Sequence, residues 1–215
     1  MKKMIDAVIL DVDGTLWDST GVVAKAWTKA VDQCGFSDMV ITPQQLQKLF
    51  GKTMDVIAEA LLPEEDETTR KNVIDRCCEL EHEAVSENQT DITYEGVVDT
   101  MRKAPLPVAI VSNCQSGYIE LFMDKTNTAD CVVDLECFGN TGEGKAENIR
   151  RVVARNGWKN PIYVGDTAGD LEACRAAGVP FVWARYGFGE IDPRDAIAVI
   201  DSFSEVLDVI GYADI

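Results

Sequence analysis

Two aspartates, Asp11 and Asp13, stand one residue apart directly after the apolar run at residues 5–10. The run predicts a short buried strand, so both carboxylates are poorly solvated and raise each other's pKa unless a cation is present. Carboxylate oxygens are the hard ligands that Mg²⁺ prefers, and Mg²⁺ keeps several waters for a substrate. Gly14 lets the backbone turn sharply and bring N–H groups toward an anion. The spacing favours a magnesium site beside an anion site, with an Asx turn that ends the strand as the alternative.

A second acidic segment follows the apolar run at residues 161–164. Asp166 comes just after this run, and Asp170 lies four residues later, at the start of an expected helix. Asp166 joins the first pair as a third carboxylate, whereas Asp170 either adds to the metal site or is only a favourable charge near a helix N-terminus. The candidate metal ligands are therefore Asp11, Asp13, Asp166 and Asp170.

Lys145 stands where a cation is mildly unfavourable, at the start of the helix predicted over residues 146–154. The helix dipole opposes a positive charge there by up to ~1 kcal/mol, and a local anion would reverse that preference. Ser112 and Asn113 end the apolar run at residues 107–112 and can donate hydrogen bonds to phosphate oxygens. An exposed lysine and a routine Ser-Asn turn remain the alternatives for these residues.

The pattern of strands and helices explains how these residues can meet. Apolar runs of strand length alternate with helical segments at 146–154 and 171–177, which favours a doubly wound parallel sheet of the α/β class. The runs lie at residues 5–10, 107–112, 131–133, 161–164 and 180–184. In such a sheet ligands bind beyond the carboxyl ends of the strands, so separate strands deliver the polar clusters to one rim.

Residues 18–90 differ from the rest of the chain because they contain no convincing strand. Helical patterns occur instead at residues 22–31, 44–49, 54–62 and 67–85. We therefore predict an all-helical cap over residues 18–90, inserted into an α/β core formed by residues 1–17 and 91–215.

The composition indicates an ordinary folded chain with an acidic surface: 46% of its 215 residues are hydrophobic, and its formal net charge is −17. Nucleic acid and anionic membranes require a basic footprint, so neither is expected as a partner. Seven cysteines without a CxxC pair, and the single histidine His82, argue against zinc sites and disulfides. Reduced thiols in a cytoplasmic monomer or dimer are expected, without a signal peptide or membrane span. His82 is expected on the surface.

A family resemblance rests on five segments, which read ILDVDGTLWDS (9–19), IVSN (110–113), GKAENI (144–149), YVGDTAGD (163–170) and AAGVPFVWARYGFG (176–189). In this order they resemble the motifs of the haloacid-dehalogenase superfamily of aspartate-nucleophile hydrolases. The chain is similar to the phosphoglycolate-phosphatase-like branch, which has a helical cap after the first motif. The resemblance covers essentially the whole chain and implies a phosphatase acting on a small phosphorylated metabolite.

The resemblance implies a role for each aspartate. Asp11 would attack phosphorus and form an aspartyl-phosphate, which is covalent catalysis by a carboxylate. Asp13 would protonate the leaving alkoxide and then take a proton from the water that hydrolyses the intermediate. Mg²⁺ would be held by an Asp11 carboxylate oxygen, the Asp13 carbonyl and the Asp166 carboxylate, with Asp170 in direct contact or just behind them.

The resemblance also implies phosphate-binding residues. Ser112 and Lys145 would hold the phosphoryl oxygens and neutralise charge in the transition state. The segment Phe50-Gly51-Lys52-Thr53 resembles a cap loop that points at the leaving group, so Lys52 would read an anionic substrate unless it is only a solvated lysine. Phosphoglycolate, sugar phosphates, nucleotides and pyrophosphate all stay open as substrates. Trp17, close to the first motif, is expected to pack and to border the site.

Other activities of the superfamily are distinguished at a few positions. Dehalogenases and phosphonate hydrolases lack the aspartate that stands here at Asp13, so both are disfavoured. Phosphosugar mutases carry a histidine and an arginine where this chain has Val23 and Met54, which favours a phosphatase with the mutase as the alternative. A catalytically retired binding protein would have lost Asp11, Asp13, Asp166 or Lys145, and all four are present.

Overall fold

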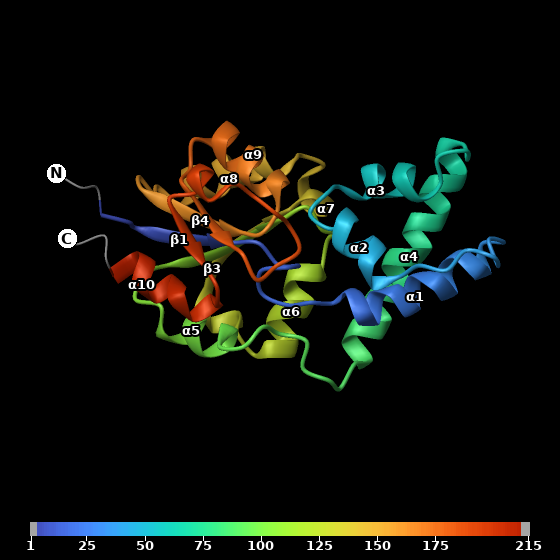
Figure 1. Ribbon diagram of the computed structural model, residues 1–215, viewed down its shortest axis with the longest axis horizontal. Helices are drawn as coiled ribbons and strands as arrows, with labels where there is room; N and C mark the ends of the chain where they lie inside the picture. Colours follow the sequence, from blue (N-terminus) through green and yellow to red (C-terminus); the bar gives the residue numbers. More distant parts are fainter. Residues whose placement is uncertain (1–3, 212–215) are drawn as a thin grey trace.

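A six-stranded parallel sheet forms the centre of the structure, a computed structural model that describes residues 4–211 (Figure 1). Its strands lie side by side in the order β3-β2-β1-β4-β5-β6. They are β1 (Ala7–Leu10), β2 (Val108–Ser112), β3 (Val132–Cys137), β4 (Pro161–Gly165), β5 (Phe181–Ala184) and β6 (Ala198–Ile200). Every neighbouring pair is parallel, so the predicted α/β class with a doubly wound sheet is confirmed.

The two edge strands differ from the sequence prediction. The apolar pattern predicts β3 only over residues 131–133, yet the strand continues to Cys137. Its polar residues Asp134 and Glu136 both accept hydrogen bonds from Arg155, which lets charged side chains occupy an edge strand. β6 has three residues, too few to show a periodic pattern, and no sequence signal predicts it.

Helices cover both faces of the sheet (Figure 1). α8 (Lys145–Asn156) and α9 (Ala168–Ala177) pack on one face, and α5 (Val97–Lys103), α6 (Tyr118–Thr126) and α10 (Val206–Gly211) pack on the other. Side chains alternate along β1, so Ile9 packs on the face that α8 and α9 cover, whereas Val8 and Leu10 pack on the face that α5, α6 and α10 cover. Burial on both faces explains why the strands appear in the sequence as continuous apolar runs.

Helix α9 begins three residues before the segment predicted at 171–177, because a capping box starts it. Thr167 Oγ1 accepts a hydrogen bond from the Asp170 N–H at 3.3 Å, and the Asp170 carboxylate accepts one from the Thr167 N–H at 2.9 Å. This reciprocal arrangement satisfies two N–H groups that the helix cannot pair internally. α8 is preceded by the one-turn helix α7 (Phe138–Thr141), and 3₁₀ turns span Ala129–Cys131, Pro193–Asp195 and Phe203–Glu205.

Between β1 and α5 the chain forms four helices that lie beside the sheet (Figure 1). They are α1 (Thr20–Gln33), α2 (Pro43–Leu49), α3 (Met54–Leu61) and α4 (Glu67–Glu87), and the predicted all-helical character is confirmed. The segments that enter and leave this block run side by side: Asp18 N–H donates to Ile92 O at 2.9 Å, and Tyr94 N–H donates to Leu16 O at 3.1 Å. This pairing supports our proposal that a cap domain spans residues 18–90.

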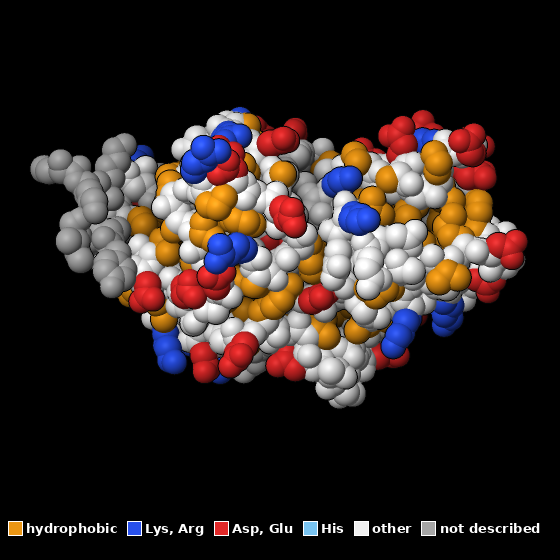
Figure 2. All heavy atoms as spheres, in the orientation of Figure 1, with side chains coloured by type: hydrophobic (Ala, Val, Ile, Leu, Met, Phe, Trp, Pro, Cys, Tyr) orange, Lys and Arg blue, Asp and Glu red, His pale blue; other side chains and the backbone are white. Residues whose placement is uncertain are grey.

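Acidic side chains are spread over both the sheet and the helical block on the face seen in Figure 2, and Lys and Arg occur there in small groups. This distribution matches a solvated acidic surface. His82 is exposed on α4, as expected. All seven cysteines are free thiols. Among the helices of residues 4–211, none combines the length and apolarity that crossing a bilayer requires.

Candidate active site

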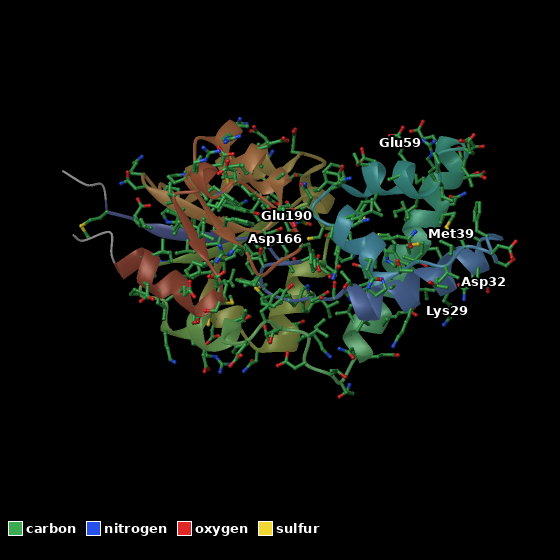
Figure 3. All side chains as sticks on the ribbon, viewed as in Figure 1. Lys29, Asp32, Met39, Glu59, Asp166 and Glu190 are labelled. Atoms are coloured by element: carbon green, nitrogen blue, oxygen red, sulfur yellow. The ribbon has the colours of Figure 1, made fainter. Side chains whose placement is uncertain are left out.

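The predicted polar residues meet at the carboxyl ends of the central strands. Asp11 follows β1, Ser112 ends β2 and Asp166 follows β4, while Lys145 and Asp170 lie in the first turns of α8 and α9. All five side chains are buried. In Figure 3, Asp166 lies at the junction of the sheet with helices α1–α4, whereas Glu59 lies on the outer side of these helices. The rim expected from the strand pattern is therefore present, and the helical block borders it.

The centre of this rim is a buried cluster of three carboxylates and one ammonium group. One oxygen of each of Asp11, Asp166 and Asp170 lies within 4.8 Å of the others. Lys145 Nζ lies 3.0 Å from Asp11 Oδ1 and also forms an ion pair with Asp170 Oδ1. Burial by itself would lower the pKa of Lys145, but Asp11 and Asp170 raise it above its usual value. Lys145 therefore stays charged, and its position at a helix start is explained by the acidic residues around it.

The cluster fits a divalent cation, because one ammonium cannot balance three carboxylates. Burial raises the pKa of Asp11 to about 6, with Lys145 opposing the shift and Asp170 adding to it. Burial, Asp170 and Asp11 raise the pKa of Asp166 well above its usual value. Asp11 Oδ1 is buried and, within residues 4–211, accepts no well-aligned hydrogen bond beyond its ion pair. Hard oxygen donors with uncompensated charge are what Mg²⁺ binds.

Position 14 requires a glycine, because the Asp166 carboxylate lies too close to leave room for a side chain. Its φ is +78°, which confirms the expected sharp turn, and a Cβ at this position would lie 2.2 Å from Asp166 Oδ2. The N–H of Gly14 itself donates to Trp17 O at 2.9 Å, and the expectation that the turn brings other N–H groups toward an anion stays a prediction. Asp166 is fixed further by the Phe188 N–H, which donates to Oδ2 at 2.7 Å. The turn thus positions a carboxylate, and Gly14 offers no free N–H to phosphate.

Both oxygens of Asp170 already have several partners. Oδ1 pairs with Lys145, and Oδ2 accepts hydrogen bonds from the Thr167 N–H at 2.9 Å, the Thr167 hydroxyl at 2.7 Å and the Asp166 N–H at 3.2 Å. A carboxylate bound in this way holds its neighbours in place and has little capacity left for a metal. The arrangement favours Asp170 as the residue that orients Lys145 and the Asp166 loop.

Asp13 is held by three donors on one oxygen. Ser19 Oγ, Tyr118 Oη and Trp17 Nε1 donate to Asp13 Oδ1 at 2.7, 2.9 and 3.0 Å. Burial nevertheless raises the pKa of Asp13 to about 7, with Ser19 and Tyr118 opposing the shift. A carboxyl that titrates near neutral pH suits a group that both gives and takes a proton. Trp17, expected to pack and to border the site, donates a hydrogen bond directly to this carboxylate.

The cap approaches the rim through the loop between α2 and α3. Asn113 Nδ2 donates to Gly51 O at 2.8 Å, so the side-chain donor expected to bind phosphate is used to hold the cap. Gly51, with φ +86°, packs against Thr167, and the Phe50 ring lies 6.5 Å from that of Phe188. Lys52 is exposed beside this contact, and its role toward an anionic substrate stays a prediction.

A small cavity of about 20 Å³ lies where cap and core meet above Asp13. The core contributes Asp13, Ser112, Asn113, Cys114 and Gln115 to its lining, and the cap contributes Phe50, Gly51, Lys52, Met54, Ile57 and Glu81. The space is that of about one water molecule, so a larger ligand could enter it only if the cap is displaced. A wider groove of about 850 Å³ runs between α2 and the start of α9 on the other side of the Phe50–Lys52 loop.

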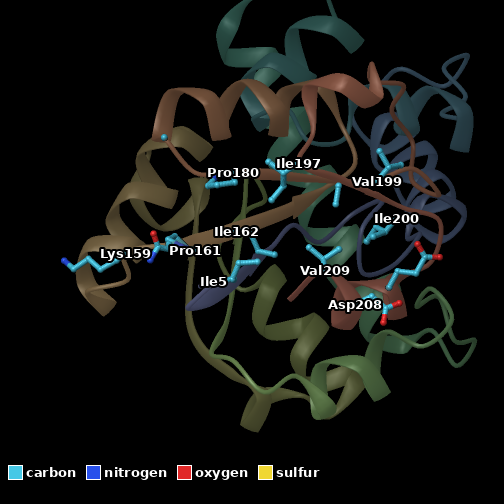
Figure 4. Close-up of a pocket in the computed structure, with 14 residues that line it drawn as sticks. Ile5, Lys159, Pro161, Ile162, Pro180, Ile197, Val199, Ile200, Asp208 and Val209 are labelled. Atoms are coloured by element: carbon cyan, nitrogen blue, oxygen red, sulfur yellow. The ribbon is translucent and has the colours of Figure 1, made fainter. Parts of the chain in front are cut away.

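A separate cavity of about 770 Å³ lies at the opposite end of the sheet (Figure 4). It is lined by residues at the amino ends of the strands, such as Ile5, Pro161 and Pro180, and by Val209 of α10. Its lining holds none of the clustered carboxylates and is largely apolar. The buried cluster of Asp11, Asp166, Asp170 and Lys145 is therefore not part of this cavity.

Glu81 is a buried carboxyl in the middle of α4, with 2% of its surface exposed. Trp27 Nε1 donates to Oε2 at 2.7 Å, and Gln115 Nε2 donates to Oε1 at 3.0 Å. Burial raises the pKa of Glu81 to about 8, the Gln115 hydrogen bond opposes the shift, and the nearby Asp13 adds to it. Trp27 of the cap and Gln115 of the core thus hold the Glu81 carboxyl against the cavity.

Glu81→Gln is expected to remove a pH-dependent loss of stability. A carboxyl whose pKa is raised on folding contributes stability that is fully present below its unfolded pKa and lost as pH rises through its folded pKa. For Glu81 these values are 4.5 and about 8, so the loss runs from about pH 5 to pH 9. Relative to the variant, the wild type should lose roughly 2–5 kcal/mol of unfolding free energy across this range.

Urea unfolding in EDTA at pH 5, 7 and 9 measures this difference. The exposed Glu83 lies two residues further along α4, and Glu83→Gln removes the same charge as a control that should follow the wild type. Parallel pH curves for the wild type and Glu81→Gln would contradict the assignment.

No role was predicted from the sequence for four residues of the site: Ser19, Tyr118, Gln115 and Glu81. Ser19 lies within the segment 9–19 that carries the resemblance, so its closeness to Asp13 is readable from spacing. Tyr118, at the start of α6, reaches Asp13 only because α6 packs under β1 and β2. Glu81 and Gln115 are 34 residues apart and meet only where the cap contacts the core.

Comparison with known proteins finds a family model and related proteins that match most of the chain. The family model described as haloacid dehalogenase-like hydrolase matches residues 8–184. A phosphoglycolate phosphatase from Photobacterium profundum is 25% identical over 227 residues, which cover 97% of each chain. One from Vibrio parahaemolyticus is 27% identical over 234 residues, again 97% of each chain.

Solved structures share the fold. A predicted phosphoglycolate phosphatase from Haemophilus somnus superposes with a TM-score of 0.84 at 18% identity, covering 97% of this chain and 99% of the other. A predicted phosphatase from Clostridium acetobutylicum gives a TM-score of 0.83 at 18% identity, covering 98% and 100%. Both superpositions extend over nearly the whole of this chain.

Proposed function

The chain belongs to the haloacid dehalogenase-like hydrolase family, and from this membership we propose that it is a Mg²⁺-dependent phosphatase of small phosphorylated metabolites, acting through an aspartyl-phosphate on Asp11. The resemblance found in the sequence and the expected class of enzyme, a hydrolase of this family, are confirmed. The observation that carries the proposal is the buried ion pair between Lys145 and Asp11, beside the Asp13 carboxylate that three donors hold in one orientation.

The first half of the reaction begins at Asp11. A carboxylate oxygen of Asp11 attacks phosphorus, the bond to the ester oxygen breaks, and the electron pair leaves with the alkoxide. Protonated Asp13 gives its proton to that oxygen, so a neutral alcohol departs. Lys145 and Ser112 hold the phosphoryl oxygens and stabilise the charge that spreads over them.

The second half releases inorganic phosphate. The Asp13 carboxylate, now ionised, takes a proton from water as the water attacks the phosphorus of the aspartyl-phosphate. The acyl phosphate bond breaks, Asp11 regains its carboxylate and Asp13 regains its proton. The pKa of Asp13, about 7, places both of its forms within reach near neutral pH.

Asp11 and Asp166 are the carboxylates proposed to hold Mg²⁺ together with the Asp13 carbonyl, whereas Asp170 orients Lys145. When bound there, Mg²⁺ would balance the excess negative charge of the cluster and that of the phosphoryl oxygens. Its position beside the Asp11–Lys145 pair is supported by the raised pKa values of Asp11 and Asp166.

Two positions favour a phosphatase over a phosphosugar mutase. Val23 is fully buried in α1, and Met54 lines the cavity at the start of α3. Neither offers the charge or the titratable ring that a mutase of this superfamily carries there. A retired binding protein is disfavoured because Asp11, Asp166 and Lys145 are in contact or close together in one buried site.

The remaining expectations form part of this proposal. We place the protein in the cytoplasm, supported by its seven free thiols, and expect a small phosphorylated metabolite and no nucleic acid as its partner. The expected monomer or dimer stays a prediction.

Removal of divalent metal is expected to abolish phosphate release. Hydrolysis of para-nitrophenyl phosphate should stop in excess EDTA and return with Mg²⁺, because the Asp11 and Asp166 charges need a cation to admit an anionic substrate. Ca²⁺ should restore little activity, since its larger and looser shell disturbs the alignment. Measured phosphate release with each ion tests this, and full turnover in excess chelator would contradict the proposal.

A further inference from the structure

Two core residues that line the cavity above Asp13, Asn113 and Gln115, carry hydrogen-bond acceptors without partners in the part of the chain that the structure describes. Within residues 4–211, Asn113 Oδ1 and Gln115 Oε1 are buried oxygens without any donor. The orientation of Asn113 is fixed, because its Nδ2 donates to Gly51 O at 2.8 Å, and turning the amide would place two oxygens together. A buried acceptor without a donor costs free energy, and a ligand that donates a hydrogen bond would recover it.

Glu81 adds a carboxyl group to these acceptors. Its two oxygens accept hydrogen bonds from Trp27 and Gln115, which hold the group against the cavity. Protonation of Glu81 would remove its charge but would not add a positive one. In either state the acidic group lies on the cap side of the cavity, where the leaving part of a substrate would lie when phosphorus is at Asp11.

The lining contains little that would stabilise an anion at this end. Lys145 is on the core side and is already paired with Asp11 and Asp170. Lys52 is the cation among the cavity residues on the cap side, and it is exposed to solvent, where an ion pair contributes little. The other cap residues around the cavity are Phe50, Gly51, Met54, Ile57 and Glu81.

We propose that Glu81, with the side-chain oxygens of Asn113 and Gln115, selects phosphate esters whose leaving alcohol carries a hydroxyl or ammonium donor and rejects those that carry a carboxylate. This selection rests on the proposed phosphatase function. A donor group would satisfy acceptors that are otherwise buried without partners. A carboxylate would lose its water and meet Glu81, Asp13 and two amide oxygens instead.

Three esters of nearly equal size test this selection: 2-hydroxyethyl phosphate, 2-aminoethyl phosphate and 2-phosphoglycolate. Their leaving groups end in a hydroxyl, an ammonium and a carboxylate. We expect kcat/KM for each of the first two to exceed that for phosphoglycolate by at least ~10-fold, because a carboxylate that loses its water beside the Asn113 and Gln115 oxygens gains no hydrogen bond from them, whether or not Glu81 is ionised. This comparison uses only the wild-type enzyme, so it does not depend on whether any variant folds.

At pH 9, above the pKa of about 8 that burial gives Glu81, Glu81→Gln removes a negative charge. There it is expected to raise the ratio of kcat/KM for phosphoglycolate over hydroxyethyl phosphate by ~10-fold, and to lower that for aminoethyl phosphate. Ratios measured on one preparation are independent of the folded fraction, so partial unfolding cannot imitate the change. Glu83→Gln removes the same charge from an exposed position of α4 and should leave both ratios as in the wild type.

The outcomes separate this inference from the proposed function. A wild-type preference for phosphoglycolate, or ratios unaffected by Glu81→Gln, would overturn the inference if para-nitrophenyl phosphate is still hydrolysed. A phosphoglycolate preference that Lys52→Gln abolishes would show instead that Lys52 reads an anionic group. Failure to hydrolyse any of the four esters with Mg²⁺ would overturn the phosphatase proposal and this inference with it.

Discussion

Replacing Asp11 by asparagine is expected to remove turnover and phosphoenzyme formation together, and to lower phosphate release by on the order of 10⁴-fold or more. Asparagine keeps the shape of the side chain, but an amide oxygen is a poor nucleophile toward phosphorus. Asp11 is buried, with 1% of its surface exposed, and lies 3.0 Å from Lys145, the residue proposed to hold the phosphoryl oxygens.

The variant should fold, because removing a charge whose burial is unfavourable relieves part of the repulsion within the cluster. Rapid quenching with ³²P-labelled substrate measures the phosphoenzyme, and a phosphate-release assay measures turnover. Asp99, exposed on α5, provides the matched control Asp99→Asn, which should retain wild-type rates. Normal phosphoenzyme formation by Asp11→Asn would assign the nucleophile to another residue.

Asp13→Asn is expected to lower hydrolysis of alkyl phosphates by ~10²–10⁴-fold, which is the usual contribution of general acid–base catalysis. The carbonyl oxygen of asparagine can still accept the hydrogen bonds that Ser19, Tyr118 and Trp17 donate. The side chain should therefore keep its orientation while losing the ability to transfer a proton. Substrate and metal binding should change little.

The loss should depend on the leaving group. Para-nitrophenolate leaves without much help from an acid, so formation of the phosphoenzyme from para-nitrophenyl phosphate should be affected less than formation from an alkyl phosphate. Single-turnover kinetics with both esters measure this contrast, with Asp99→Asn again as the control. Equal losses for the two esters, or wild-type rates on the alkyl phosphate, would show that Asp13 is not the proton donor.

Much of the site follows from local sequence, since strand ends are easily recognised. Apolar runs mark β1, β2 and β4, and the polar residues directly after them must lie at one edge of a parallel sheet. This reasoning brings together Asp11, Ser112 and Asp166 without knowledge of the strand order. The edge strands β3 and β6 were harder to predict, because charged residues or short length hide their apolar pattern.

The hydrogen-bond partners of the site residues could not be predicted from local sequence. Gly14 was expected to let a turn bring N–H groups toward phosphate, yet its own N–H donates to Trp17 O, and the glycine is needed because Asp166 approaches it. Asn113 was expected to donate to phosphate, yet its amide binds the carbonyl of Gly51 in the cap. Whether a donor and an acceptor form a hydrogen bond depends on the distance and the angle between them, and only the packed structure determines these two quantities.

Residue types and spacing by themselves determined the α/β core, the helical block and the buried acidic rim with Lys145, because each depends on periodicity or on residues next to a strand end. Only the tertiary structure decided how Asp13 is held and which residues line the cavity above it. Tyr118 reaches Asp13 across 105 residues of sequence, and Glu81 reaches Gln115 from the cap. Such contacts arise where separate helices pack together, and no local sequence pattern predicts which helix faces will be in contact.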